Sequence, residues 1–308
     1  MSVDLLILGA GWTSTFLISL CEERGIRFAA TSRSGRDATI PFVFDPDSDD
    51  QTVYETLPDA QTVLITFPIQ KGGASQRLVE GYKSTRRNKM DKVGFIQLGA
   101  TSIWDPTKTS EGPSNGPWCD RHSPYSHTAR AVCEDELLAL SPSTPAIVLN
   151  LAGLWGDQRL PRNWVGRVAP TKDALRSKGS LHLIHGIDVA RAVLAVHGNL
   201  SRAQGQRWIL TDGRTYDWWD LASGWGAPPR DAAISISDSK NVHSSTAISV
   251  QDSEDQRGPQ PRWVGELMEE QGIRALPRSP ELLGRALDSR EFWTTFDLNP
   301  VKPLLGCC

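Results

Sequence analysis

The first residues of the chain carry the feature that most constrains its fold. An apolar run at residues 5–8 (LLIL) has the length of a buried β-strand, and it stops at Gly9-Ala10-Gly11. Residues 12–21 continue with helix-compatible spacing. A strand, a glycine turn and a helix N-terminus in this order form an anion site, because backbone N–H groups converge there and the helix dipole favours a diphosphate. The alternative is an ordinary strand-to-helix turn that binds nothing.

The two glycines of this turn have separate expected roles. Gly9 permits the tight bend, and Gly11 lets the backbone approach the phosphates. The third glycine of a G-x-G-x-x-G fingerprint is replaced by Ser14, so the match is incomplete. Trp12, Thr13 and Ser14, at the start of the predicted helix, are assigned to the same binding site.

Length and charge limit the class of protein. A chain of 308 residues can form one large domain or two interleaved subdomains. A net charge of −3 argues against a nucleic-acid or anionic-membrane partner. The sequence has no run of 18 apolar residues, and its five cysteines form no C-x-x-C pair and no metal-ligand spacing. We therefore expect a cytoplasmic protein without a metal site, acting on a small molecule.

Strands and helices alternate through the first half of the chain, as in a doubly wound parallel sheet. Residues 1–152 are predicted to form a Rossmann-type α/β domain, completed by a helix near 187–197 and a strand near 207–211. Residues 153–308 are expected to be mainly a smaller C-terminal substrate-side region, with a mobile polar segment near 228–261. Further strands are predicted at 26–31, 41–44, 62–67, 93–98 and 145–151, and further helices at 74–83, 126–139, 264–271 and 279–287.

The second predicted strand bears on the choice of dinucleotide. An NAD site needs a carboxylate about twenty residues after the glycines, to bind the ribose 2′-hydroxyl. This chain has Thr31-Ser32-Arg33-Ser34 there, with Arg36 beyond. A guanidinium at this point can bind a 2′-phosphate, so NADP is favoured over NAD. Alternatively, the two arginines are solvent-facing loop residues.

The remaining residues assigned to the cofactor site follow other predicted strands. Asp45, after the third strand, is placed to accept a hydrogen bond from an adenine amino group. Phe67 and Pro68, at the end of the fourth strand, are assigned to the same site.

A family resemblance becomes visible in the order of several motifs. The series GAGWTS, TSRS, FDPD, LGATSIWD, SPYSHTARAVCE and NLAGLWGDQR resembles the short-chain dehydrogenase/reductase superfamily, in particular its extended or atypical branch, which includes NAD-dependent epimerases and dehydratases. The likeness extends to about residue 212. It implies a catalytic Ser/Thr at Thr101 and a catalytic tyrosine at Tyr125, which lies 24 residues later.

The sequence departs from this family next to the tyrosine. The family has a lysine four residues after it, but Ala129 stands here and the nearest cation is Arg130. An offset of five residues turns the side chain about 100° further around a helix, so Arg130 is not a simple substitute. A phenol with a pKa of about 10 is only about 0.1% ionised at pH 7. Tyr125 is therefore a poor general base, whereas a neutral phenol can still donate a proton to a reduced carbonyl.

Three functions are consistent with these residues. The first is an NADP-dependent oxidoreductase that reduces a small carbonyl or sugar-like substrate, with Tyr125, Thr101 and Arg130 at the reacting centre. The second is a non-catalytic NADP(H)-binding sensor or regulatory protein, which the missing lysine favours. The third is an isomerase that uses the cofactor as a scaffold. The resemblance also implies a possible homodimer.

Overall fold

The computed structural model describes residues 2–86, 93–105, 116–227 and 257–304. These residues form two compact units. Unit 1 contains the described residues among 2–154 together with 182–214 and 287–304, and unit 2 contains the described residues among 155–181 and 215–286. None of the helices in these ranges combines the length and the apolar character needed to cross a membrane.

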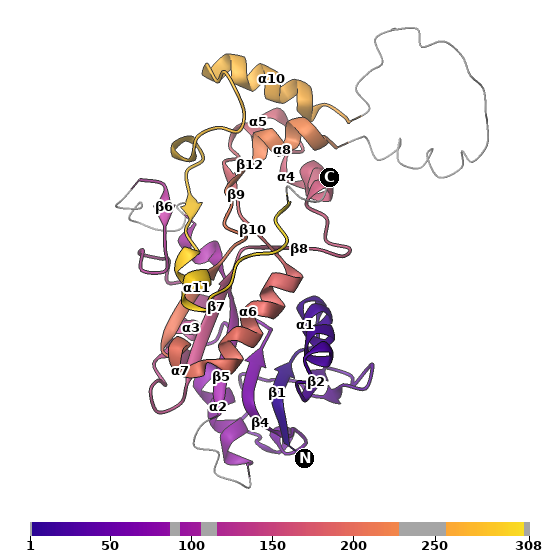
Figure 1. The fold of residues 1–308 in the computed structure, drawn as a ribbon, viewed down its shortest axis with the longest axis vertical. Coiled ribbons are helices and arrows are strands. Elements are labelled where there is room, and N and C mark those ends of the chain that lie inside the picture. The colour runs from indigo at the N-terminus through magenta and orange to yellow at the C-terminus, as the bar shows by residue number, and fades with distance from the viewer. Residues whose placement is uncertain (1, 87–92, 106–115, 228–256, 305–308) are drawn as a thin grey trace, which may run out of the picture. The chain divides into compact units, whose positions relative to one another are not determined.

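A seven-stranded sheet forms the centre of unit 1, in the order β11-β7-β5-β4-β1-β2-β3 (Figure 1). Every neighbouring pair in this sheet is parallel. This arrangement confirms the Rossmann-type α/β fold predicted from the sequence. The strands are β1 (Ser2–Leu8), β2 (Phe28–Ser32), β3 (Ile40–Pro41), β4 (Asp59–Ile65), β5 (Gly94–Ala100), β7 (Ala146–Leu151) and β11 (Gln206–Leu210).

Helices cover both faces of this sheet, which explains why its strands are almost continuously apolar. Along β1, Leu5 and Ile7 face one hydrophobic core and Leu6 and Leu8 face the other. The first core contains residues of α1 (Trp12–Glu23), α6 (Gly186–Gly198), α7 (Leu200–Ala203) and α11 (Arg290–Thr295). The second contains residues of α2 (Ala74–Ser84), α3 (Ala129–Leu138) and the 3₁₀ turn η1 (Thr52–Tyr54).

Residues 287–304 return to unit 1, a feature that the alternation of strands and helices does not predict. The rings of Phe292 and Phe296 meet the Trp208 ring of β11 at centroid distances of 5.8 and 5.6 Å. Further along, the fully buried carboxylate of Asp188 accepts hydrogen bonds from the backbone N–H groups of Val301 and Lys302. This C-terminal segment therefore completes the cover over one face of the sheet.

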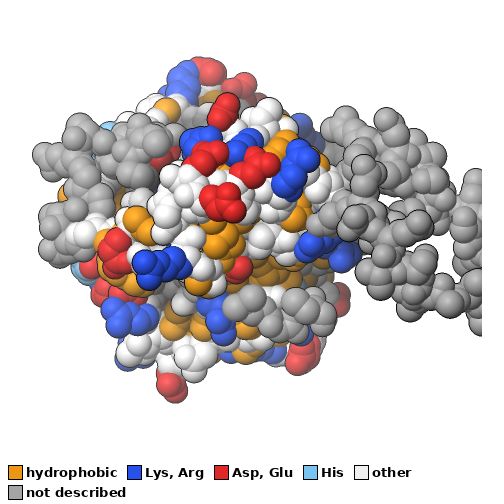
Figure 2. Space-filling view, turned by 90° about the horizontal axis from the view of Figure 1, so that it is seen from above, with side chains coloured by type: hydrophobic (Ala, Val, Ile, Leu, Met, Phe, Trp, Pro, Cys, Tyr) orange, Lys and Arg blue, Asp and Glu red, His pale blue; other side chains and the backbone are white. Residues whose placement is uncertain are grey.

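Unit 2 is built around a buried ion pair. Arg278 donates to both carboxylate oxygens of Asp217, and its guanidinium lies 3.8 Å from the centre of the Trp219 ring. On the face drawn in Figure 2, basic side chains lie interspersed with acidic ones. The elements of unit 2 are η3 (Pro161–Trp164), α4 (Val165–Val168), α5 (Lys172–Arg176), β9 (Ser180–Leu181), β12 (Tyr216–Asp217), α8 (Trp218–Trp225), α10 (Gln260–Gln271) and η4 (Pro280–Leu282).

Short elements complete the described chain. Unit 1 also contains η2 (Thr101–Trp104), β6 (Trp118–Cys119) and β10 (Leu183–His185). The chain passes between the units four times: within β8 (Gly153–Trp155), between residues 181 and 182, between residues 214 and 215, and within β13 (Ala286–Leu287).

Some predicted elements differ from the observed ones. The helix expected at 279–287 is wrong: this stretch holds the 3₁₀ turn η4 and strand β13, because Gly284 adopts a left-handed conformation (φ 79°) that breaks a helix. The strand expected at 41–44 ends at Pro41. Most of the segment expected to be mobile, residues 228–256, lies outside the described residues, and 260–261 belong to α10.

Candidate functional site

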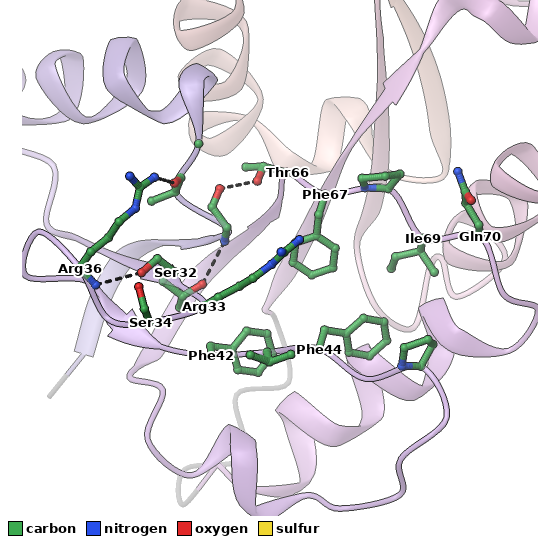
Figure 3. Close-up of a pocket in the computed structure, with 17 residues that line it drawn as sticks. Ser32, Arg33, Ser34, Arg36, Phe42, Phe44, Thr66, Phe67, Ile69 and Gln70 are labelled. Carbon is green, nitrogen blue, oxygen red and sulfur yellow. Dashed lines mark hydrogen bonds between the residues drawn. The ribbon is translucent and has the colours of Figure 1, made fainter.

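A cavity of about 630 Å³ opens at the carboxyl ends of β1, β2 and β4. Its lining residues come from four stretches, namely 9–11, 31–34 with 36, 42–44 with 46, and 66–70 (Figure 3). The first follows β1, the second joins β2 to the loop before β3, the third follows β3, and the last follows β4. Carboxyl ends of parallel strands are where such sheets bind ligands, so this cavity is the candidate site.

Two threonines, one on β2 and one directly after β4, hold the glycine turn at one end of the cavity. Gly9 has φ 93°, and a Cβ added to it would lie 2.8 Å from Thr66 Oγ1. The backbone N–H of Gly9 donates to Thr31 Oγ1 at 3.0 Å, and that of Ala10 donates to the Thr31 carbonyl at 2.6 Å. On the other side, Thr66 Oγ1 donates to the Gly9 carbonyl at 2.5 Å. The turn is therefore rigid before any ligand arrives.

Gly11 leaves open space in front of helix α1. Its backbone is extended (φ −117°), and a Cβ added there would meet nothing within 4 Å. No neighbouring atom therefore requires a glycine at this position, whereas a ligand that approaches the α1 N-terminus would. The N-terminus of α2 is already occupied, since the Glu136 carboxylate accepts from the Gly73 N–H at 2.9 and 3.0 Å. Of these two helix N-termini, only that of α1 borders the cavity.

Two arginines supply positive charge to the cavity. Arg33 reaches across it toward the Phe67 ring, while Arg36 turns back to the glycine turn, where Nη2 lies 3.5 Å from the Ala10 carbonyl (Figure 3). The residues that line the cavity include no Asp or Glu. This charge balance suits a ligand that carries several phosphate charges.

Aromatic and aliphatic side chains form the other wall. The rings of Phe44 and Phe67 are stacked with centroids 5.9 Å apart. Gln97 of β5 holds the backbone of Phe67 in place, because its Nε2 donates to the Phe67 carbonyl at 3.1 Å. Val43 at the rim is 57% exposed, which is high for a valine beside a folded core. A flat apolar group, such as a nucleobase, would bury this surface. The apolar lining residues are Phe42, Val43, Phe44, Pro46, Phe67, Pro68 and Ile69.

The cavity brings together only part of the predicted cofactor set. Gly9, Gly11, Ser32, Arg33, Phe67 and Pro68 line it. Trp12, Thr13 and Ser14 are in the first turn of α1 but are not lining residues. Asp45 is also outside the lining, and its Oδ1 accepts from the Asp47 N–H at 2.9 Å. Thr31 and Thr66, which hold the glycine turn, were not predicted as site residues.

The predicted catalytic residues do not line this cavity. Tyr125 donates through its hydroxyl to Asp135 Oδ1 at 2.8 Å, and the guanidinium of Arg207 lies 4.4 Å from the centre of its ring. Asp135 is six residues into α3, about 9 Å along the helix from its start at the carboxyl edge of the sheet. The hydroxyl is thus bound to the second half of α3.

Burial and the Asp135 carboxylate raise the pKa of Tyr125, and Arg207 opposes this shift without cancelling it. The phenol is therefore protonated at neutral pH. Thr101 is buried at the start of η2, directly after β5. Arg130 donates to Glu134 Oε1 at 3.1 Å and to the Leu98 carbonyl at 2.5 Å, so its guanidinium faces the sheet.

No protein-family model and no curated protein sequence matches the chain. Solved structures with the same fold include Gre2 from Candida albicans in complex with NADPH, which is 9% identical with a TM-score of 0.60, over 97% of this chain and 95% of that one. A short-chain dehydrogenase/reductase superfamily protein from Agrobacterium tumefaciens with bound NAD is 9% identical with a TM-score of 0.58, over 97% and 93%.

A UDP-N-acetylglucosamine 4-epimerase from Bacillus cereus is 10% identical with a TM-score of 0.57, over 97% and 94% of the two chains. Structural neighbours of the chain thus include short-chain dehydrogenase/reductase and epimerase proteins, the superfamily that the sequence motifs resemble. At these identities the likeness establishes the fold that this chain shares with them.

Proposed function

We propose that the protein is an NADP(H)-dependent oxidoreductase of the atypical short-chain type, which reduces a small carbonyl or sugar-like substrate. One observation carries the proposal: a rigid glycine turn, an open helix N-terminus and two guanidiniums line the same cavity, without a carboxylate. NAD-selective sites of this kind place a carboxylate where this chain has Arg33.

The lining residues fit the adenosine half of NADP. The Gly11 backbone and the start of α1 suit the diphosphate, and Arg33 and Arg36 suit the 2′-phosphate. The apolar wall around Phe44 and Phe67 suits the adenine ring. Two proteins that share the fold were solved with NADPH or with NAD, which supports a nicotinamide nucleotide here without deciding between the two.

Bound NADPH would supply a hydride for reduction of the substrate. The protein would then provide a proton donor and a group that orients the substrate oxygen. In this proposal, the protonated Tyr125 hydroxyl donates the proton and Thr101 orients the oxygen. Tyr125 must first leave its hydrogen bond to Asp135, which lies 2.8 Å away.

A second candidate is a non-catalytic NADP(H)-binding protein. The observation that favours it is the same hydrogen bond, because the phenol that would serve as the acid is already engaged by Asp135 and by the Arg207 guanidinium. Such a protein would bind the nucleotide tightly and turn over no carbonyl compound.

Calorimetry with NADP⁺, NADPH and NAD⁺ tests the binding step. Arg33→Met is expected to weaken NADP⁺ binding by roughly ten- to a hundredfold, because one charge-assisted hydrogen-bond partner contributes about 1.5–3 kcal/mol, and to leave NAD⁺ binding unchanged. Arg24→Met, at the exposed C-cap of α1, is the matched control. No binding heat with any of these nucleotides would refute the proposal.

The oxidation of NADPH in the presence of a panel of aldehydes and ketones separates the two candidates. The oxidoreductase predicts turnover that Tyr125→Phe reduces by about 10²-fold or more. Equal turnover by the parent and the variant would remove Tyr125 from the mechanism. Tight nucleotide binding with no turnover across the panel would favour the non-catalytic candidate.

A further inference from the structure

The loop at residues 33–39, between β2 and β3, carries both arginines of the cavity and has an unusual backbone. Gly35, Asp37 and Ala38 have φ values of 70°, 52° and 59°. A Cβ at Gly35 would lie 2.7 Å from Cγ of Pro41. Non-glycine residues in the left-handed region cost free energy and persist only where the surrounding contacts hold them. Contacts within this loop must therefore stabilise its left-handed residues.

Two hydroxyl groups supply those contacts. Thr39 Oγ1 donates to the Arg36 carbonyl at 2.5 Å, and the Thr39 N–H donates to the same oxygen at 2.9 Å. Ser32 Oγ lies 2.7 Å from Thr39 Oγ1 and accepts from the Arg36 N–H at 3.2 Å. With Ser32 donating to Thr39, each hydroxyl proton has one acceptor and both ends of the Arg36 backbone are bound.

The hydrogen bonds among Ser32, Arg36 and Thr39 form a closed ring. This ring holds the Arg36 backbone rather than the ligand. Ser32 borders the cavity but is only 8% exposed. Its hydroxyl makes its hydrogen bonds to Thr39 and Arg36 within the loop. The Arg36 side chain leaves the ring toward the glycine turn (Figure 3). The ring thus fixes the Cα position and the direction of one of the two guanidiniums before a nucleotide enters.

We infer that Thr39 is a positioning residue that sets the selectivity of this cavity for a nucleotide with a 2′-phosphate. The inference rests on the proposed NADP(H) binding. Its physical basis is pre-organisation: a loop already held in its binding conformation loses less entropy when its arginines bind a phosphate. The 2′-phosphate is the part of the ligand that this loop would meet, so binding of NAD⁺, which lacks it, does not depend on Thr39.

The test compares Thr39→Val with Thr39→Ser. Valine keeps the shape of threonine but removes the hydroxyl, whereas serine keeps the hydroxyl. By calorimetry, Thr39→Val is expected to weaken NADP⁺ binding about five- to tenfold, the equivalent of one net hydrogen bond, and to change NAD⁺ binding less than about twofold. Thr39→Ser is expected to bind both nucleotides as the parent does. Thr56→Val, which loses one exposed 3.4 Å hydrogen bond in unit 1, is the matched control.

A double-mutant cycle makes the role specific. If Thr39 acts through Arg36, Thr39→Val has no further effect on NADP⁺ affinity in the Arg36→Met background. Equal losses for NADP⁺ and NAD⁺, unchanged NADP⁺ affinity in Thr39→Val, or full additivity with Arg36→Met would each overturn the inference and leave the proposed function standing. A parent chain that binds neither nucleotide would overturn both.

Discussion

The hydroxyl of Tyr125 donates a 2.8 Å hydrogen bond to Asp135, which also accepts from Arg207 Nη2 at 2.6 Å. A carboxylate beside a phenol stabilises the protonated phenol, because ionisation would place two negative charges together. This contact therefore keeps Tyr125 neutral, and it also engages the hydroxyl proton in a hydrogen bond to Asp135. Any catalytic use of Tyr125 depends on how easily Asp135 releases it.

Removing the charge of Asp135 tests this relationship. Asp135→Asn is expected to lower the pKa of Tyr125, since the carboxylate is one of the groups that raise it. The measurement is the ultraviolet pH titration of the variant and of the parent, each after subtraction of the matching Tyr125→Phe chain. A phenol pKa that does not change, or rises, in Asp135→Asn would contradict the assigned role of the carboxylate.

The pH dependence of stability follows from another tyrosine in unit 1. Burial raises the pKa of Tyr82 to about 12, and its hydroxyl donates to the Pro58 carbonyl at 2.9 Å. The unfolded phenol loses its proton near pH 10, so the free energy of unfolding is expected to fall as the pH rises from about 10 to 12. Urea unfolding over this range is expected to show a smaller decline for Tyr82→Phe; parallel curves would contradict the shift.

The glycines of the turn offer a prediction with matched controls. Gly9→Ala is expected to lower the free energy of unfolding by about 1–3 kcal/mol, because the residue needs φ 93° and its Cβ would press on Thr66. Gly25→Ala isolates the cost of a positive φ, since a Cβ there meets nothing within 4 Å. Both are measured by urea unfolding, and equal losses would exclude a contribution from Thr66.

Gly11→Ala is expected to separate binding from folding. Its Cβ meets no protein atom, so the unfolding free energy stays within about 0.5 kcal/mol of the parent. Nucleotide affinity is expected to fall at least about tenfold, because the added Cβ stands where phosphate oxygens would approach the backbone. The variant then loses a charge-assisted hydrogen bond to the phosphate, which contributes about 1.5–3 kcal/mol. Unchanged affinity would place the diphosphate elsewhere.

The sequence predicted the centre of the fold because its signals are local. The apolar run of β1 and the glycines after it lie within a few residues of each other, and the structure has β1 and α1 there. The threonines that hold this turn, Thr31 and Thr66, become neighbours only when β2 and β4 pair with β1 on either side. A single sequence gives the ends of those strands but not their order.

The direction of the Tyr125 side chain also could not be predicted from the sequence. Motif spacing places the residue before a helix, but its partners are Asp135 on α3 and Arg207 on β11. The pairing of β11 with β7 brings Arg207 to this position, and nothing near residue 125 indicates it. In contrast, Arg33 was predicted as a cavity residue because it directly follows a strand whose carboxyl end forms part of the cavity.

A buried charge network beside Tyr125 is expected to contribute to the free energy of unfolding. Arg207 Nη1 donates to Glu134 at 2.9 Å and to Asn150 at 3.1 Å, and Glu134 is 1% exposed. Arg207→Met is expected to cost about 3–5 kcal/mol of unfolding free energy, because it leaves the Glu134 carboxylate under-compensated in the core. In the double variant with Glu134→Gln the loss is expected to be smaller than the sum of the two single losses, by urea unfolding. Strict additivity would contradict a direct coupling.

The carboxylate of Asp188 anchors the C-terminal segment. It accepts from Val301 and Lys302 in the C-terminal segment and from Arg191 Nη1 at 2.8 Å. Asp188→Ala is expected to lower the free energy of unfolding by about 2–4 kcal/mol, because these three donors lose their buried acceptor. Asp173→Ala, whose side chain is 92% exposed and pairs with Arg176 at 3.6 Å, is the control and is expected to change it by less than about 0.5 kcal/mol. Similar losses in both variants would contradict the anchoring role.

The return of residues 287–304 to unit 1 has a consequence for biosynthesis. While the nascent chain emerges from the ribosome, the strands that border the cavity are made first, but Asp188 and the Trp208 ring gain their partners only after unit 2 has been translated. Stalled ribosome complexes that expose the chain only as far as β11 are therefore expected to leave this half sensitive to protease, and release beyond residue 302 is expected to protect it.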